Sequence, residues 1–199
     1  LRTTKVKEVR DVARTRTISI MRALDTKRND LVIQFLREAK LIIDDNSILN
    51  SADMEGTDLK GLNFQGVYMQ LANLAGVNLA EANLEFASLA GANLSGANLK
   101  KTKFRKANLE NAVLEGAEMI ETVFGGANLE NANLTFSDLT AAGFGGANLK
   151  NANFDGSILV EADLFHAQAD GASFADEANL SGVNLEKSNL KGSTCWTCR

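Results

Sequence analysis

Residues 72–109 read ANLAG VNLAE ANLEF ASLAG ANLSG ANLKK TKFRK ANL, so a triplet close to Ala-Asn-Leu returns every five residues. The period continues from residue 52 to about residue 194 and supplies 28 central sites, of which 18 are Leu, 6 Phe, 3 Met and one Ala. The site before each central residue is Asn in 14 repeats and Asp in 4, and the site before that is Ala in 18. Such regularity indicates a repeated structural unit.

A period of five matches neither the 3.6-residue period of a helix nor the two-residue period of a flat strand. The chain must therefore turn once per repeat, with one large apolar and one small side chain pointing inward. Four such repeats close a coil of twenty residues, and coils that pair along their backbones lie about 4.8 Å apart. The 28 repeats predict an all-β solenoid of seven coils, roughly 34 Å long.

Central residues twenty positions apart should stack in columns that form the core. One column is rich in phenylalanine, and flat rings at the coil spacing would fill it continuously. Its members, the predicted structural core, are Phe64, Leu84, Phe104, Phe124, Phe144 and Leu164.

The repeat A-(N/D)-L-x-x, as in Ala92-Asn93-Leu94, resembles the pentapeptide-repeat family over nearly three quarters of the chain. The resemblance implies a right-handed quadrilateral β-helix. It also implies, loosely, an interaction or scaffold role, because most of the family has no assigned biochemical activity.

Two features should shape the corners of the coils. Asn and Asp suit turns because their side chains bond nearby backbone and tolerate unusual dihedral angles, so we expect them at the corners. The step from Phe174 to Leu180 is six residues instead of five, so one extra residue near Asp176 and Glu177 should bulge outward.

Residues 1–51 lack the repeat and are expected to cap the solenoid, which occupies residues 52–199. Two apolar stripes, separated by a turn at residues 25–30, predict a helical hairpin with a plug of apolar residues behind it. The stripes comprise Val9, Val12, Ala13, Ile20, Met21 and Leu24, and Leu31, Val32, Phe35, Leu36 and Ala39; the plug comprises Leu41, Ile42, Ile43, Ile48 and Leu49. Residues 13–42 are also similar to a region of cyanobacterial pentapeptide-repeat proteins that can follow membrane-spanning helices.

Nothing in the sequence assembles a catalytic, metal or cofactor site, so we expect no enzyme. His166 is the only histidine, and no nucleophile has a base beside it. Cys195 and Cys198 form a CxxC pair that fits a disulfide, a redox pair or two packed thiols in an incomplete last coil. A zinc site would need four ligands, and no second pair completes one.

The outward positions offer two kinds of surface. Residues 100–106 include five basic side chains, which fit either a phosphate-binding patch or ladders of salt bridges to neighbouring coils. We favour the ladders, because Lys101 should lie between Glu81 and Glu121, and Arg105 beside Glu85. Apolar or aromatic side chains mark a possible interaction surface. These are Tyr68, Phe86, Ile120 and Val160.

We therefore expect a non-enzymatic scaffold that binds a protein partner. The net charge of −4 disfavours a nucleic-acid partner. No apolar run is long enough to span a membrane, and we expect a cytoplasmic location. Two alternatives remain open: a DNA-mimicking inhibitor or protector of type II topoisomerase, as some relatives are, and the soluble domain of a membrane-anchored or lumenal protein whose anchor lies upstream of Leu1. The sequence does not specify the oligomeric state.

Overall fold

Two helices precede the solenoid in the computed structural model, which describes residues 2–195 and the side chains of residues 7–195. Helix α1 spans Arg2–Ala23 and helix α2 spans Thr26–Glu38. Asp25 ends the turn between them, and its side chain accepts a hydrogen bond from Arg28 N at 2.9 Å, as an N-cap residue does. The buried amide of Asn29 donates to Met21 O at 2.9 Å and so ties α2 to the end of α1. The two helices agree with the expected hairpin.

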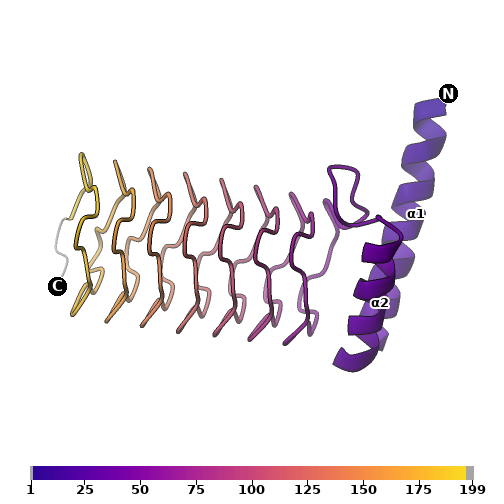
Figure 1. Ribbon diagram of the computed structural model, residues 1–199, viewed down its shortest axis with the longest axis horizontal. Helices are drawn as coiled ribbons and strands as arrows, with labels where there is room; N and C mark the ends of the chain where they lie inside the picture. Colours follow the sequence, from indigo (N-terminus) through magenta and orange to yellow (C-terminus); the bar gives the residue numbers. More distant parts are fainter. Residues whose placement is uncertain (1, 196–199) are drawn as a thin grey trace.

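The rest of the chain winds into a stack of coils that extends away from the helices (Figure 1). Each coil pairs with the next through parallel backbone bridges between residues twenty positions apart, as in Asp53 with Asn73 and Asn73 with Asn93. Bridges recur every five residues along the chain, which gives each coil four sides. Each side is too short for a continuous strand, so the pairing within the described residues consists of isolated bridges.

The inward side chains form columns along the axis of the stack. All six residues of the phenylalanine-rich column are fully buried. Phe104 and Phe124 stack with ring centroids 5.3 Å apart, and Phe124 and Phe144 do so at 4.9 Å. A second stack, which we did not anticipate, joins Phe154 and Phe174 at 5.0 Å on the opposite side of the coil. Stacked rings and alanines at the coil spacing leave a close-packed interior.

The corners of the coils do not lie where the sequence suggested. The left-handed backbone occurs two residues after each central residue, as at Gly96 (φ 62°) and Lys101 (φ 58°). The Asn one residue before the centre lies on the flat side instead, where Asn63 Oδ1 accepts from Gln65 N at 3.1 Å. The prediction that Asn and Asp form the corners is therefore wrong, although their bonding to nearby backbone is confirmed.

The extra residue does bulge outward. Asp176 and Glu177 are exposed and both have left-handed backbone, with φ of 51° and 65°. Beyond them, bridges join residues 21 positions apart, as in Ile158 with Asn179. The predicted insertion is confirmed, and it leaves the ladder of coils intact.

The hairpin buries fewer apolar residues than its sequence stripes suggested. Ile18, Met21, Ile33 and Leu36 pack against the first coil, together with Ile42, Ile48 and Leu49 of the plug. The outward faces of the helices expose Val9, Val12, Ile20, Leu31 and Phe35, all of which we had placed on the packing stripes. Leu41 and Ile43 are also exposed, because the plug segment alternates in and out. Among the described residues, no helix is both long and apolar enough to cross a membrane.

Candidate interaction surface

The four residues predicted as an interaction surface do not form one continuous surface on the rod. Phe86 occupies a corner, is half exposed, and has Lys106 Nζ 5.7 Å from its ring centroid. Tyr68 lies on the first coil, where its backbone N donates to Ile42 O at 2.8 Å. Ile120 and Val160 share another side. Tyr68 bridges Ser88, two residues after Phe86, so Tyr68 and Phe86 also lie near each other on adjacent coils. The structure therefore brings the four residues together as two separate pairs.

Ile120 and Val160 belong to a ladder that runs across neighbouring coils. Glu121 N bonds to Thr140 O at 3.0 Å and Ala141 N bonds to Val160 O at 2.8 Å, which places Thr140 between the two apolar residues. Ile158, which the sequence analysis missed, lies two residues before Val160 and is 44% exposed. The sequence feature that could have identified Ile158 is a β-branched apolar residue at the position that is Asn or Asp in most repeats. We name Ile120, Thr140, Ile158 and Val160 the apolar ladder.

Acidic residues border the apolar ladder. Glu118 and Asp138 precede it in the bridge column that continues to Ile158, and Glu121 and Glu161 follow it at the adjoining corner. Glu118 and Glu121 are paired with lysines, whereas Asp138 and Glu161 have no ion-pair partner among the described residues. The border is thus partly uncompensated negative charge.

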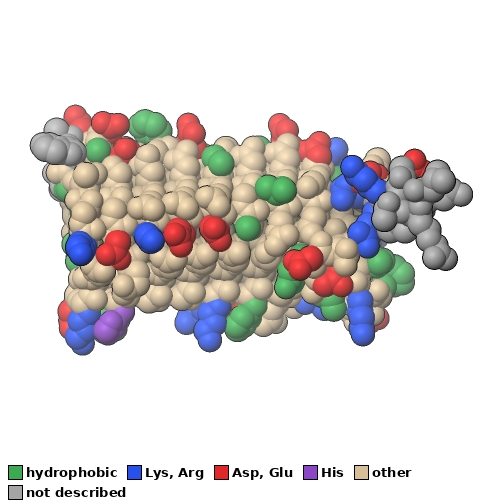
Figure 2. All heavy atoms as spheres, turned by 90° about the horizontal axis from the view of Figure 1, so that it is seen from above, with side chains coloured by type: hydrophobic (Ala, Val, Ile, Leu, Met, Phe, Trp, Pro, Cys, Tyr) green, Lys and Arg blue, Asp and Glu red, His purple; other side chains and the backbone are tan. Residues whose placement is uncertain are grey.

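The basic run at residues 100–106 is mostly paired with acidic residues of the coils on either side. Lys100 Nζ lies 2.8 Å from Glu118 Oε2, and Lys101 Nζ lies 3.6 Å from Glu121 Oε2. Arg105 Nε lies 3.7 Å from Glu85 Oε1. Glu81, the other expected neighbour of Lys101, pairs with Lys60 instead, at 3.1 Å. Figure 2 shows the charged side chains of one face as separate spots with neutral surface between them. The ion pairs of residues 100–106 match salt-bridge ladders better than a phosphate patch.

The first coil presents an edge that the repeat cannot satisfy by itself. On each side of an inner coil, two carbonyl oxygens accept hydrogen bonds from the coil before it; Asn83 O accepts from Phe64 N at 2.7 Å, and Glu85 O accepts from Gly66 N at 2.8 Å. The first coil has no coil before it. Its equivalent carbonyls need other donors, because unpaired backbone groups destabilise a fold.

Arginines from the two helices supply donors on two of the four sides. Arg37 of α2 donates to Asn63 O at 2.9 Å and, from its other terminal nitrogen, to Gln65 O. Arg22 of α1 donates to Asp53 O at 3.2 Å. A guanidinium presents a rigid fork of N–H groups, which suits a pair of carbonyls on one side of a coil. The basic charge of the helical segment therefore has a structural role that the sequence analysis missed.

The segment after α2 covers another side. Ser51 N donates to Gln70 O at 2.8 Å, and Ser47 Oγ donates to Tyr68 O at 2.6 Å. Together with the bond from Tyr68 N to Ile42 O, these contacts replace the missing coil on the side that begins at Tyr68.

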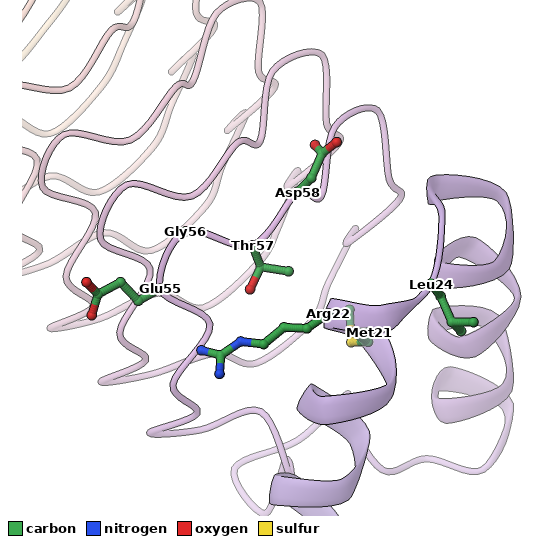
Figure 3. Close-up of a pocket in the computed structure, with 7 residues that line it drawn as sticks. All are labelled: Met21, Arg22, Leu24, Glu55, Gly56, Thr57 and Asp58. Carbon is green, nitrogen blue, oxygen red and sulfur yellow. The ribbon is translucent and has the colours of Figure 1, made fainter.

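The remaining side, residues 58–60, is uncovered. Within the described part of the chain, neither Asp58 O nor Lys60 O accepts a hydrogen bond. A cleft of about 180 Å³ lies beside it, between the coil and the turn of the hairpin, and is lined by Met21, Arg22, Leu24, Glu55, Gly56, Thr57 and Asp58 (Figure 3). Thr57 is buried, and its hydroxyl oxygen has no hydrogen-bond partner.

No catalytic arrangement emerges among the side chains of residues 7–195. The described residues hold no group of three or more His, Cys, Asp or Glu side chains that could bind a metal ion. His166 is exposed at a corner, with its ring 4.4 Å from that of Phe165. Cys195 is disulfide-bonded, and Cys198 lies outside the described residues.

Comparisons with known proteins identify the repeat. The family model for pentapeptide repeats matches eight copies, over residues 45–76, 68–105, 107–144, 143–176 and 157–194. No curated protein matches the chain at a significant level.

Solved structures of similar proteins include a trypsin-treated variant of QnrB1, a plasmid-mediated fluoroquinolone resistance protein, with 19% identity, a TM-score of 0.59 and coverage of 74% of this chain and 78% of that one. HetL, a pentapeptide repeat protein involved in heterocyst differentiation regulation in the cyanobacterium Nostoc sp. strain PCC 7120, is 22% identical over 80% of this chain and 92% of its own, with a TM-score of 0.40. Rfr23 from the cyanobacterium Cyanothece 51142 is 32% identical over 66% and 89%, with a TM-score of 0.29. The likeness to QnrB1 shows the fold alone. Since the family model covers most of the chain, the protein belongs to the pentapeptide repeat family, whose members form right-handed quadrilateral β-helices.

Proposed function

We propose that this protein is a non-enzymatic interaction scaffold: a rigid rod of about seven coils, residues 52–199, with a helical cap of residues 1–51. Its partner is a protein that docks on the side of the rod. The family is generally non-enzymatic, and the cleft described above lies where the helices meet the first coil.

The observation that carries the proposal is the fixed spacing of the outward side chains. Backbone bridges hold every coil to its neighbours, so residues such as Thr140 and Val160 cannot move independently. A partner that matches this spacing binds a preorganised surface and loses little conformational freedom.

The apolar ladder is the favoured docking side. Ile158 is 44% exposed, and an apolar centre within a polar and acidic border is the usual layout of a protein interface. The uncompensated charges of Asp138 and Glu161 favour a partner with basic residues around an apolar patch.

The test is affinity capture from a cyanobacterial lysate with three forms of the intact chain. The first is unaltered, the second carries Ile120→Lys and Val160→Lys, and the third carries Glu110→Gln and Glu130→Gln on a different side, which change the net charge by the same amount. Capture of a discrete protein by the first and third forms, and its loss with the second, would support docking on the ladder. Equal capture by all three would place the interface elsewhere.

Topoisomerase inhibition is the alternative activity, and a supercoiling assay with purified gyrase tests it directly. Here the rod departs from a uniform acidic surface, because the salt-bridge ladders at residues 100–106 interrupt it. Inhibition at sub-micromolar concentration would replace the scaffold proposal with DNA mimicry.

A further inference from the structure

We infer that the uncovered side of the first coil, residues 58–60, is a receptor for the guanidinium group of an arginine on a protein partner. This inference deepens the proposed function, on which it rests, because it names a second contact point at the helical end of the rod.

The neighbouring side of the first coil, residues 63–65, shows how a guanidinium binds to such a pair of carbonyls. Asn63 O and Gln65 O are held by one guanidinium, that of Arg37. Asp58 and Lys60 are the residues five positions earlier, and Asp58 and Asn63 occupy equivalent bridge positions in the coil. Asp58 O and Lys60 O therefore form the same two-carbonyl acceptor, and no donor in the described part of the chain takes it.

The buried hydroxyl of Thr57 has no partner, so its oxygen is free to accept an N–H group from an incoming guanidinium. At equivalent inward positions of later coils, Thr102 Oγ1 donates to Leu79 O at 2.7 Å and Thr122 Oγ1 donates to Leu99 O at 2.6 Å, both in the preceding coil. Thr57 has no preceding coil, so its oxygen is left without a partner in the wall of the cleft. In Figure 3, Thr57 extends from the coil toward the end of α1.

The charges around the cleft favour a cation. Glu55 and Asp58 line it, and within residues 7–195 their carboxylates accept hydrogen bonds only from neutral groups: Asn73 Nδ2 for Glu55, and Asn78 Nδ2 and Lys60 N for Asp58. The two nearby cations are already engaged, since Arg22 lies 3.7 Å from Asp53 and Lys60 lies 3.1 Å from Glu81. The local excess of negative charge matches an incoming guanidinium.

The test is an NMR titration of the full chain with a capped Gly-Arg-Gly peptide, following the backbone carbonyl carbons. Matched peptides carry lysine or citrulline in place of arginine, and the free guanidinium ion serves as a fourth probe at concentrations below those that unfold the protein. We expect the arginine peptide to shift the carbonyl signals of Asp58 and Lys60 and to leave those of Asn63 and Gln65 unchanged, because Arg37 occupies the latter pair. We also expect Thr57→Val, and Glu55→Gln with Asp58→Asn, each to raise the Kd about two- to fivefold, as loss of one weak hydrogen bond or of an exposed ion pair does.

The variant Arg37→Ala provides an internal positive control, because it opens the neighbouring carbonyl pair to the same peptide. Shifts at Asn63 and Gln65 in this variant without shifts at Asp58 and Lys60 would overturn the inference, as would equal shifts with the citrulline peptide. Binding of free guanidinium as tight as that of the peptide would overturn the assignment to a protein arginine. None of these outcomes bears on the apolar ladder, so failure here is distinguishable from failure of the proposed function.

Discussion

At the carbonyl oxygen of Asn63, the guanidinium of Arg37 occupies the place that a backbone N–H holds everywhere further along the solenoid. Phe64 N is that donor for Asn83, one coil later. A side chain of the helical hairpin thus supplies the hydrogen-bond donor that a preceding coil would otherwise supply. The hairpin is bound to the solenoid by hydrogen bonds to its backbone as well as by apolar packing.

Arg37→Ala should lower the free energy of unfolding by about 1–3 kcal/mol, because it leaves two carbonyls without their charged donor. Urea denaturation measures the change, since guanidinium chloride would supply the missing group. The control is Arg28→Ala, whose side chain lies 3.7 Å from Asp25 and is largely exposed, and which should cost much less. Equal losses in the two variants would contradict the role of Arg37.

Phe124→Ala should destabilise the protein by about 3–5 kcal/mol, because Phe124 is fully buried between two stacked rings. Phe86→Ala is the matched control: Phe86 is half exposed at a corner and contacts Lys106. Its loss should cost less than about 1 kcal/mol. Thermal unfolding followed by circular dichroism compares the two, and similar midpoints would mean that the aromatic column is not rigid.

The same substitution at two threonines should have opposite effects. Thr122→Val removes a buried hydrogen bond of 2.6 Å to Leu99 O and should cost about 1 kcal/mol. Thr57→Val removes a buried hydroxyl oxygen that has no partner, so stability should stay unchanged or rise. Urea midpoints measured side by side check this, and a marked loss in Thr57→Val would show that its hydroxyl is bonded.

Gly156→Ala should destabilise more than Gly96→Ala. Both glycines have a left-handed backbone conformation, with φ of 67° and 62°, so either substitution costs about 1–2 kcal/mol of backbone strain. A Cβ at Gly156 would also lie 2.5 Å from the ring of Phe136, whereas nothing lies within 4 Å of one at Gly96. Adding Phe136→Ala to Gly156→Ala relieves that clash; if the double variant is no more stable than the single one, the ring does not cover Gly156.

The sequence predicted the solenoid well because the same residue types recur at the same position in many repeats. The inward columns, the extra residue near Asp176 and the pairing of Arg105 with Glu85 all follow from counting in fives and twenties. Asn and Asp were misplaced because three positions per repeat point outward, and their turn preference does not say which of the three is the corner. Glycines such as Gly126 and Gly146, which the sequence also places at corners, do lie there with left-handed backbone.

The ends of the solenoid could not be predicted in this way. Arg22 and Arg37 occur once each, and their roles depend on where the hairpin places them against particular carbonyls. The exposure of Leu31 and Phe35, 65% and 64%, likewise depends on the angle at which the hairpin meets the coil. Their sequence spacing is that of any amphipathic helix.

The extra residue at Asp176 and Glu177 has a consequence for how such a rod can vary. Bridges shift from a separation of 20 residues to one of 21, yet the apolar columns and the backbone pairing continue beyond it. A change in length is therefore absorbed within one corner and is not transmitted to the next coil. Evolution can add residues to the outside of this protein one corner at a time, and so acquire new loops without redesigning its interior.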